Sequence, residues 1–281
     1  TEYKWFSEVT DGATKKSESV RSEWKEKIAE EVEGVPVPKG FTYKEGTKDT
    51  GLVIQDAKGN EFVWVPANES TYVKDTSFPS RDNIKPTGDD TLPNGITEET
   101  VDVKKYGGFY IGRYEAGIPE GDTSPSNKTG IPVSKKGEIV WSGINYTNAK
   151  ANAEKMINNE YVQTGLLTGK AWDTVCHWIK SDDELKDSRT YGNYNNSLAP
   201  ANENSGTRRT AGFNENWKVK NIYDLAGNVW EWTSEANSSD FILRGGSSYG
   251  NGSGFPVSSR YNYIASSTDG YVGFRSRLYI K

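Results

Sequence analysis

Apolar residues recur at every fourth position near the N-terminus, in a stretch rich in Lys and Glu: Val20, Trp24, Ile28 and Val32. This spacing is typical of an amphipathic helix, and a glycine such as Gly34 commonly ends one. We therefore predict a helical segment over residues 1–34 and a main domain over residues 35–281. The helix could pack on the domain or form a stalk or oligomer contact, although four apolar positions are few for a coiled coil.

Short apolar runs separated by turn residues predict strands in the main domain. Residues 51–55 and 61–65 flank Lys58, Gly59 and Asn60, which is typical of a β-hairpin. Residues 109–115 are a further strand candidate. Residues 75–106 and 181–220 are polar and rich in Pro, Asn, Gly or Ser, which predicts long loops.

Two helices are predicted between these loops. Residues 147–158 contain good helix formers, with Thr147 placed as the N-terminal cap. Residues 168–180 can form a helix that buries Trp172, Val175 and Ile179. Few helices, many short strands and long loops together indicate an irregular, loop-rich α+β fold.

The bulk properties exclude several classes of protein. Only 33% of the 281 residues are hydrophobic, so the nine Trp and sixteen Tyr are expected to carry much of the core. The net charge is −5, and an acidic chain of this kind is not expected to offer the basic surface that binding to nucleic acid requires. No run approaches the roughly 18 apolar residues of a membrane span, and no secretory signal is present. The chain begins at Thr1, so we expect a longer protein whose targeting segment is not included.

The C-terminal segment has a narrow residue alphabet. Between Gly245 and Phe274 there is no Lys, Glu, Gln, Met or Trp, and Ser, Gly, Tyr and Asn dominate. Antibody contact surfaces have this composition, because Tyr offers large rigid area while Ser, Gly and Asn adapt. A Gly- and Ser-rich loop could also lack those five types through loop propensity alone.

Residues 222–233 form the specific string Ile-Tyr-Asp-Leu-Ala-Gly-Asn-Val-Trp-Glu-Trp-Thr. This string resembles the signature of the formylglycine-generating-enzyme (sulfatase-modifying factor) domain family, and the resemblance extends over roughly residues 60–281. Other motifs follow in the family's order: Gly-Phe-Tyr-Ile-Gly-Arg-Tyr-Glu at 108–115, a degraded helix start at 165–172, Arg-Gly-Gly-Ser at 244–247 and Gly-Phe-Arg at 273–275. The resemblance implies a C-type-lectin-like fold whose long loops present a binding face.

The oxidase activity of that family is not expected here. Its oxidising members use a cysteine pair shortly after Gly-Gly-Ser, and the matching residues 248–255 contain no Cys. Cys176 is the only cysteine and His177 the only histidine, which excludes a disulfide, a copper-binding thiolate pair and a His-rich iron site. Neighbours on a helix also point in different directions, so these two do not form a catalytic pair. We predict a non-enzyme without a catalytic cofactor.

A non-catalytic branch of the same fold fits better. The segment resembles that of the variable proteins of diversity-generating retroelements, in which template adenines are randomised. Randomising both adenines of an Asn codon of the form AAY never yields Lys, Glu, Gln, Met or Trp. Those are the five types absent here, so we predict a variable region over about 245–275.

The predicted ligand contacts lie between framework positions. The framework is expected at Arg244, Gly245, Gly246, Ser247, Arg260, Gly273, Phe274 and Arg275. The contact candidates are Tyr249, Gly250, Asn251, Gly254, Phe255, Tyr261, Asn262, Tyr263, Ile264, Asp269, Gly270 and Tyr271. The four aromatic candidates Phe255, Tyr261, Tyr263 and Tyr271 are expected to dominate binding, with core packing as the competing interpretation.

A structural calcium site is also implied by the resemblance. The carboxylates of Asp224 and Glu231 and the carbonyls of Gly227 and Val229 are oxygen donors of the kind that Ca²⁺ takes. A turn role for Asp224 and a solvated Glu231 are the alternative. Trp230 and Trp232 alternate with Glu231, so both are expected to pack in the core.

The partner is expected to be an unknown protein or surface ligand, with neither nucleic acid nor membrane insertion by this chain. A position on a phage tail or a bacterial cell surface suits such a protein, and the oligomeric state stays open. Two alternatives remain: a structural tail or surface subunit with a fixed protein contact, and a divergent oxidase of the formylglycine-generating-enzyme type.

Overall fold

The computed structural model describes residues 27–79, 88–89, 98–237 and 240–281. The strands are β1 (Ile28–Val32), β2 (Val35–Pro38), β3 (Phe41–Glu45), β4 (Val53–Asp56), β5 (Glu61–Pro66), β6 (Gly88–Asp89), β7 (Gly108–Gly112), β8 (Val162–Leu166), β9 (Lys218–Val219), β10 (Ile222–Tyr223), β11 (Trp230–Asn237), β12 (Asp240–Arg244), β13 (Arg260–Tyr263), β14 (Val272–Phe274) and β15 (Ser276–Ile280). The α-helices are α2 (Glu98–Tyr106), α3 (Tyr146–Met156) and α4 (Gly169–Ile179), and short 3₁₀ turns occur at Glu184–Lys186 and Glu215–Trp217.

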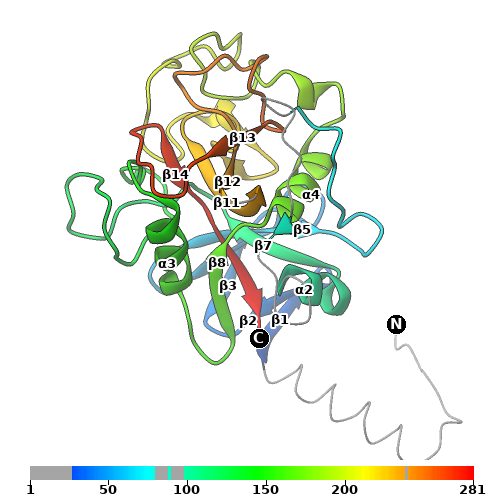
Figure 1. Cartoon of the computed structure of the whole chain (residues 1–281). Coiled ribbons are helices and arrows are strands. Elements are labelled where there is room, and N and C mark those ends of the chain that lie inside the picture. The colour runs from blue at the N-terminus through cyan, green and yellow to red at the C-terminus, as the bar shows by residue number, and fades with distance from the viewer. Residues whose placement is uncertain (1–26, 80–87, 90–97, 238–239) are drawn as a thin grey trace, which may run out of the picture.

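The strands form two main sheets. One has six antiparallel strands in the order β3-β4-β5-β7-β15-β8. The other has the order β13-β12-β11-β14, with β14 parallel to β11 and β6 paired to β11. Figure 1 shows β12, β13 and β14 in the upper half of the molecule, away from the C-terminus. This loop-rich α+β architecture agrees with the C-type-lectin-like fold that the sequence resemblance implies.

Both faces of the six-stranded sheet are buried, which explains why its central strands are continuous apolar runs. In β5, Phe62 and Trp64 face one core cluster while Val63 and Val65 face another. The second cluster also contains Trp172 of α4. A further cluster lies between α3 and the second sheet, and holds Trp230 and Trp232. The core role predicted for these two tryptophans is confirmed.

The predicted hairpin and the second predicted helix are confirmed. Strand β4 pairs with β5 across the turn at Gly59. Helix α4 begins after Thr168, whose side chain accepts a hydrogen bond from the Ala171 amide and so caps the helix. Its residues Trp172, Val175 and Ile179 are buried, as expected.

Other predictions require correction. Helix α3 is capped by Asn145, which accepts from the Asn148 amide, and Thr147 lies inside its first turn. The loop predicted over 75–106 contains α2. The buried side of α2 includes the polar residue Asp102, which accepts a hydrogen bond from the Ile280 amide. Because a helix is recognised in sequence by a continuous apolar stripe, a buried carboxylate in that stripe conceals it.

The predicted N-terminal helix is wrong for residues 28–34, whereas Lys27 is helical. Residues 28–32 form β1, which pairs antiparallel with β2 and joins Val32 to Val35 across the predicted domain boundary. Glu33 and Gly34 both have positive φ, which is typical of a two-residue type I′ hairpin turn. Residues 1–26, including Val20 and Trp24, lie outside the described residues. Within those that are described, no helix is long and apolar enough to cross a bilayer.

Candidate ligand-binding site

The segment 245–275 leaves the second sheet after β12 and returns to it twice. It pairs with β12 as β13, with Arg260 opposite Arg244, and then lies parallel to β11 as β14, with Gly273 opposite Glu231. Between these attachments it forms two loops, one before β13 and one between β13 and β14. The sheet therefore holds the segment at three places while the loops face outward.

None of the twelve contact candidates is buried. Tyr249 and Ile264 are 73% and 60% exposed, and Tyr271 is 39% exposed. Asn251, Gly254, Asp269 and Gly270 are also exposed, and Gly250, Phe255, Tyr261, Asn262 and Tyr263 are half-buried. All eight framework residues are buried: Arg244, Gly245, Gly246, Ser247, Arg260, Gly273, Phe274 and Arg275. The surface and interior positions of the segment thus divide as the sequence pattern predicts.

The tight turn after β12 depends on glycine. Gly245 and Gly246 both have positive φ, and a Cβ at Gly246 would lie 2.6 Å from the Phe255 carbonyl oxygen. Tyr194 closes the turn by donating its hydroxyl to the Gly245 carbonyl at 2.7 Å. The two glycines and the Tyr194 hydrogen bond together let the chain pass in a tight turn from the interior to the exposed loop.

A buried ionic network anchors the segment. The Arg244 guanidinium lies 2.7 Å from Asp173 of α4 and 3.3 Å from Glu235 of β11. Arg260 pairs with the same two carboxylates. Lys74 joins at 2.9 Å from Glu235. Burial alone would raise the pKa of Glu235, but these cations hold it below its usual value.

The network also fixes the backbone between the two loops. Arg244 donates to the Ser258 and Ser259 carbonyls, and the Trp172 indole donates to the Val257 carbonyl at 2.9 Å. Arg260 donates to the carbonyl of Asp75, far away in sequence. Residues 256–260 are accordingly buried, which separates the exposed surface into two loops.

The four tyrosines among the contact candidates surround a shallow hollow of about 180 Å³, which we call the tyrosine hollow. It is lined by Trp230, Leu243, Ser247, Tyr249, Tyr261, Tyr263, Asp269, Tyr271 and Val272. Tyr249 and Tyr271 come from different loops, and their ring centroids are 5.6 Å apart. Trp230 and Leu243 belong to strands outside the segment. Sequence analysis assigned Trp230 to the core and made no prediction for Leu243.

Three of the aromatic candidates also support the core. Phe255 and Tyr261 lie 5.7 Å and 5.5 Å from the Trp230 ring, and Tyr263 lies 5.7 Å from Trp232. All three pack against the cluster between α3 and the second sheet. Substituting them would therefore change stability as well as surface chemistry, whereas Tyr249 is free of this double role.

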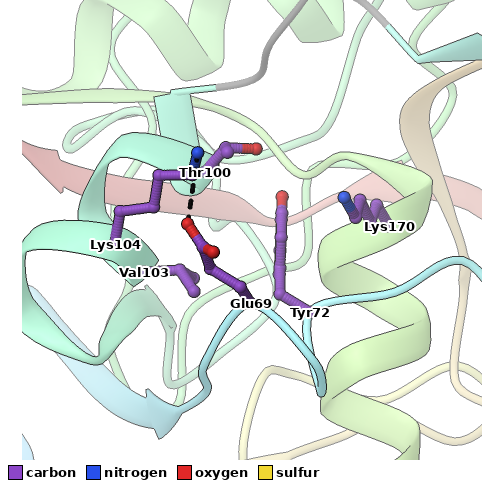
Figure 2. A pocket seen from close by; sticks show the side chains of 6 residues that line it. All are labelled: Glu69, Tyr72, Thr100, Val103, Lys104 and Lys170. Atoms are coloured by element: carbon purple, nitrogen blue, oxygen red, sulfur yellow. Dashed lines mark ion pairs between the residues drawn. The ribbon is translucent and has the colours of Figure 1, made fainter.

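A second hollow, of about 250 Å³, lies between α2, α4 and the loop after β5 (Figure 2). Glu69 forms an ion pair of 3.1 Å with Lys104 across it, and the Lys170 ammonium lies 4.6 Å from the Tyr72 ring centroid. Glu69, Lys104 and Lys170 thus each interact with another residue that lines this hollow. The hollow lies outside the segment that the sequence singled out.

The residues proposed for calcium do not fit an oxygen cage. Both carboxylate oxygens of Glu231 accept from the buried Arg275 guanidinium, at 2.8–3.2 Å, so a fixed positive charge already occupies that side. Asp224 accepts from the Gly212 amide, and its other oxygen is buried without a hydrogen bond. The Val229 amide donates to Glu115. In the described part of the chain, no group of three or more acidic, His or Cys side chains is arranged to hold a metal ion.

We therefore expect calcium to leave stability unchanged. Arg275 supplies the compensating charge that a cation would supply at Glu231, and displacing it would leave a buried guanidinium unpaired. Calorimetry of chelator-treated protein, with and without added Ca²⁺, measures this. A clear rise in melting temperature with Ca²⁺ but not with Mg²⁺ would restore Asp224, Gly227, Val229 and Glu231 as ligands.

Helix α4 directs the side chains of the neighbouring residues Cys176 and His177 to different surroundings. Cys176 is fully buried, and burial raises the pKa of its thiol to about 12, so the thiolate is scarce at neutral pH. His177 is partly exposed, contacts Asp75 at 3.0 Å and stacks on Phe78. Neither the buried thiol nor the surface imidazole is placed to act on the other.

Comparison with known proteins gave similarity in structure only. No family model matches the chain, and no curated protein matches it. Among solved structures, variable protein 1 of Treponema denticola is similar with a TM-score of 0.43 and 15% identity, covering 78% of this chain and 95% of that one. PvdO of Pseudomonas aeruginosa is similar with a TM-score of 0.38 and 16% identity, covering 81% and 97%.

Proposed function

We propose that this protein is a non-enzymatic binding protein whose C-terminal surface, over about 245–275, is diversified by a retroelement. One observation carries the proposal: side-chain exposure along the segment follows the division into framework and contact positions. The twelve contact candidates are exposed or half-buried, while the eight framework residues between and around them are buried. A protein that must change its contacts without losing its fold needs this separation.

Binding would use the exposed tyrosines and the adaptable residues beside them. Tyr249, Tyr271 and the rims of Tyr261 and Tyr263 offer rigid aromatic area, and Asn251, Gly254 and Gly270 offer small polar surroundings. The proposed partner is a protein or surface ligand met from outside, which suits display on a virion or a bacterial cell surface. The buried, protonated Cys176 thiol gives the alternative of a cysteine oxidase no support.

The genomic neighbourhood tests the proposal directly. A near-copy of the 245–275 coding region that differs only at adenines, close to a reverse transcriptase gene, is expected in the neighbouring DNA. A coding region with no such copy would favour the fixed-contact subunit instead.

The surface should also tolerate exchange. A triple variant with Ser at Tyr249, Ile264 and Tyr271 should lose little unfolding free energy, since surface substitutions usually stay within about 0.5 kcal/mol each. The matched control is Val257→Ser in the buried stretch of the same segment, which should cost about 2 kcal/mol or more. Urea unfolding measures both. A triple variant less stable than the control would show that these side chains belong to the framework.

A further inference from the structure

The tyrosine hollow has the size of a single side chain. Its volume of about 180 Å³ is below the roughly 300 Å³ at which pockets for small-molecule ligands begin. It is also an open hollow on the surface that the loops present, next to the 73%-exposed Tyr249. Such a hollow can receive one protruding group of a larger partner, and binding of this kind is often dominated by one anchored residue.

Aromatic rings form most of its walls. Tyr249 and Tyr271 are inclined at 35° with centroids 5.6 Å apart, and Tyr261 and Tyr263 are inclined at 39° with centroids 5.9 Å apart. Trp230 lies 5.5 Å from Tyr261 at a similar inclination. Rings at this spacing pack directly against each other, and all five of them line the hollow. A cation within about 6 Å of several ring faces is attracted by each of them.

The hollow carries one formal charge, and it is negative. Asp269 is the only ionisable acid or base among the described lining residues, the tyrosine hydroxyls aside. One of its oxygens accepts from the Tyr271 amide at 2.7 Å, and a carboxylate can accept several further hydrogen bonds. Burial raises the pKa of the Tyr263 hydroxyl, and the negative charge of Asp269 adds to that rise. The carboxylate therefore interacts electrostatically with a side chain that lines the hollow.

The neighbouring base is directed elsewhere. Arg208 donates to the Gly270 carbonyl and to the Ser142 hydroxyl, and it does not line the hollow. Its guanidinium therefore supports the turn that carries Asp269. The Asp269 carboxylate remains available to a cation that enters from the partner.

We propose that the tyrosine hollow receives an arginine or lysine side chain of a protein partner. The aromatic walls would hold the cation, and Asp269 would accept its N–H groups. This rests on the proposed binding function and adds the chemical class of the anchor. A saccharide could use the tyrosine hydroxyls together with Ser247 and Asp269, but it carries no positive charge and so gains less from the Asp269 carboxylate than a cation does.

The probe is N-acetyl-arginine methylamide, compared with the corresponding citrulline compound, which has nearly the same shape without the charge. NMR titration of the whole chain follows the Trp230 indole and the tyrosine ring signals. We expect saturable shifts with the arginine probe in the millimolar range and at least about tenfold weaker binding of the citrulline probe, the scale of one charge-assisted hydrogen bond.

Two carboxylate variants locate the effect. Asp269→Asn keeps the acceptor for the Tyr271 amide and should weaken the arginine probe about tenfold. Asp240→Asn is the matched control, because Asp240 lies at the start of β12, accepts from Asn262 and does not line the hollow. It should bind the probe as the parent does.

The outcomes separate this inference from the function on which it rests. Equal binding of the two probes at the tyrosine rings, or a stronger response to glucose than to arginine, would overturn the cationic anchor and leave the binding surface in place. Absence of any saturable shift would overturn it as well, as would equal weakening by Asp240→Asn and Asp269→Asn. The proposed function itself would fail separately, through the genomic and surface-exchange tests.

Discussion

Replacing Asp173 by asparagine should lower the unfolding free energy by about 3–5 kcal/mol, the usual result of removing one partner from a buried ion pair. Asp173 is fully buried and contacts both Arg244 and Arg260. In the variant, Glu235 is the one carboxylate of this network that remains to balance the positive charges of Arg244, Arg260 and Lys74. Urea unfolding at neutral pH measures the loss.

An exposed ion pair provides the control for this experiment. Asp183 lies 2.9 Å from Lys186, and its side chain is 94% exposed, so Asp183→Asn should have no measurable effect. In Asp173→Asn we also expect faster amide exchange within residues 257–260, because the network holds this stretch. A loss of stability no greater than that of the control would mean that the segment is anchored by packing rather than by charge.

The second large effect concerns pH. Asp224, Glu115 and Glu231 are three buried carboxylates near the single guanidinium of Arg275. Burial, aided by the Glu231 charge, raises the pKa of Asp224 from 3.8 to about 7. The folded protein therefore retains a proton that the unfolded chain releases. This contribution to stability is complete below about pH 4, declines as pH rises and is gone above about pH 7.

Asp224→Asn isolates this contribution. Asparagine stays neutral, accepts the Gly212 hydrogen bond and tolerates the positive φ of this position. Relative to the parent, the variant should gain stability as pH rises from 4 to 8, by at most about 4 kcal/mol. Burial also raises the pKa of Glu115, which keeps part of the slope in the variant.

Thermal unfolding between pH 4 and pH 8 provides the measurement. Asp183→Asn serves again as the exposed control, whose stability should run parallel to the parent at every pH. A variant that follows the parent equally closely would show that Asp224 is already ionised in the folded protein at pH 4.

Sequence predicted some local features and missed the distant partners. The helix over 168–180 and the core role of Trp230 and Trp232 could be predicted, because each follows from its own neighbours in the chain. The buried framework of the segment 245–275 was placed from the Arg-Gly-Gly-Ser and Gly-Phe-Arg motifs. Nothing in the sequence pointed to Asp173 and Glu235 as partners of Arg244, since an acidic residue in a helix or strand is ordinarily a surface residue.

The error at the N-terminus has a simple physical origin. Ile28 and Val32 fit a helix because they are four residues apart, but an even spacing fits one face of a strand equally well. The positive φ values of Glu33 and Gly34 decide for the hairpin. In the calcium prediction, Glu231 was assigned from its motif, while the Arg275 guanidinium that meets it comes from a strand junction 44 residues later. Motifs identify donors without showing what already binds them.

The position of β15 has a consequence for how new sequences would be screened. This strand follows the segment 245–275 in the chain, and it lies between β7 and β8 and supplies Leu278 and Ile280 to the core. On the proposed function, a frameshift or stop codon within the segment would remove the strand that joins β8 to β7 in the six-stranded sheet. Such truncated products would lose Leu278 and Ile280 from the core, so a stable fold would select for an intact reading frame through the segment.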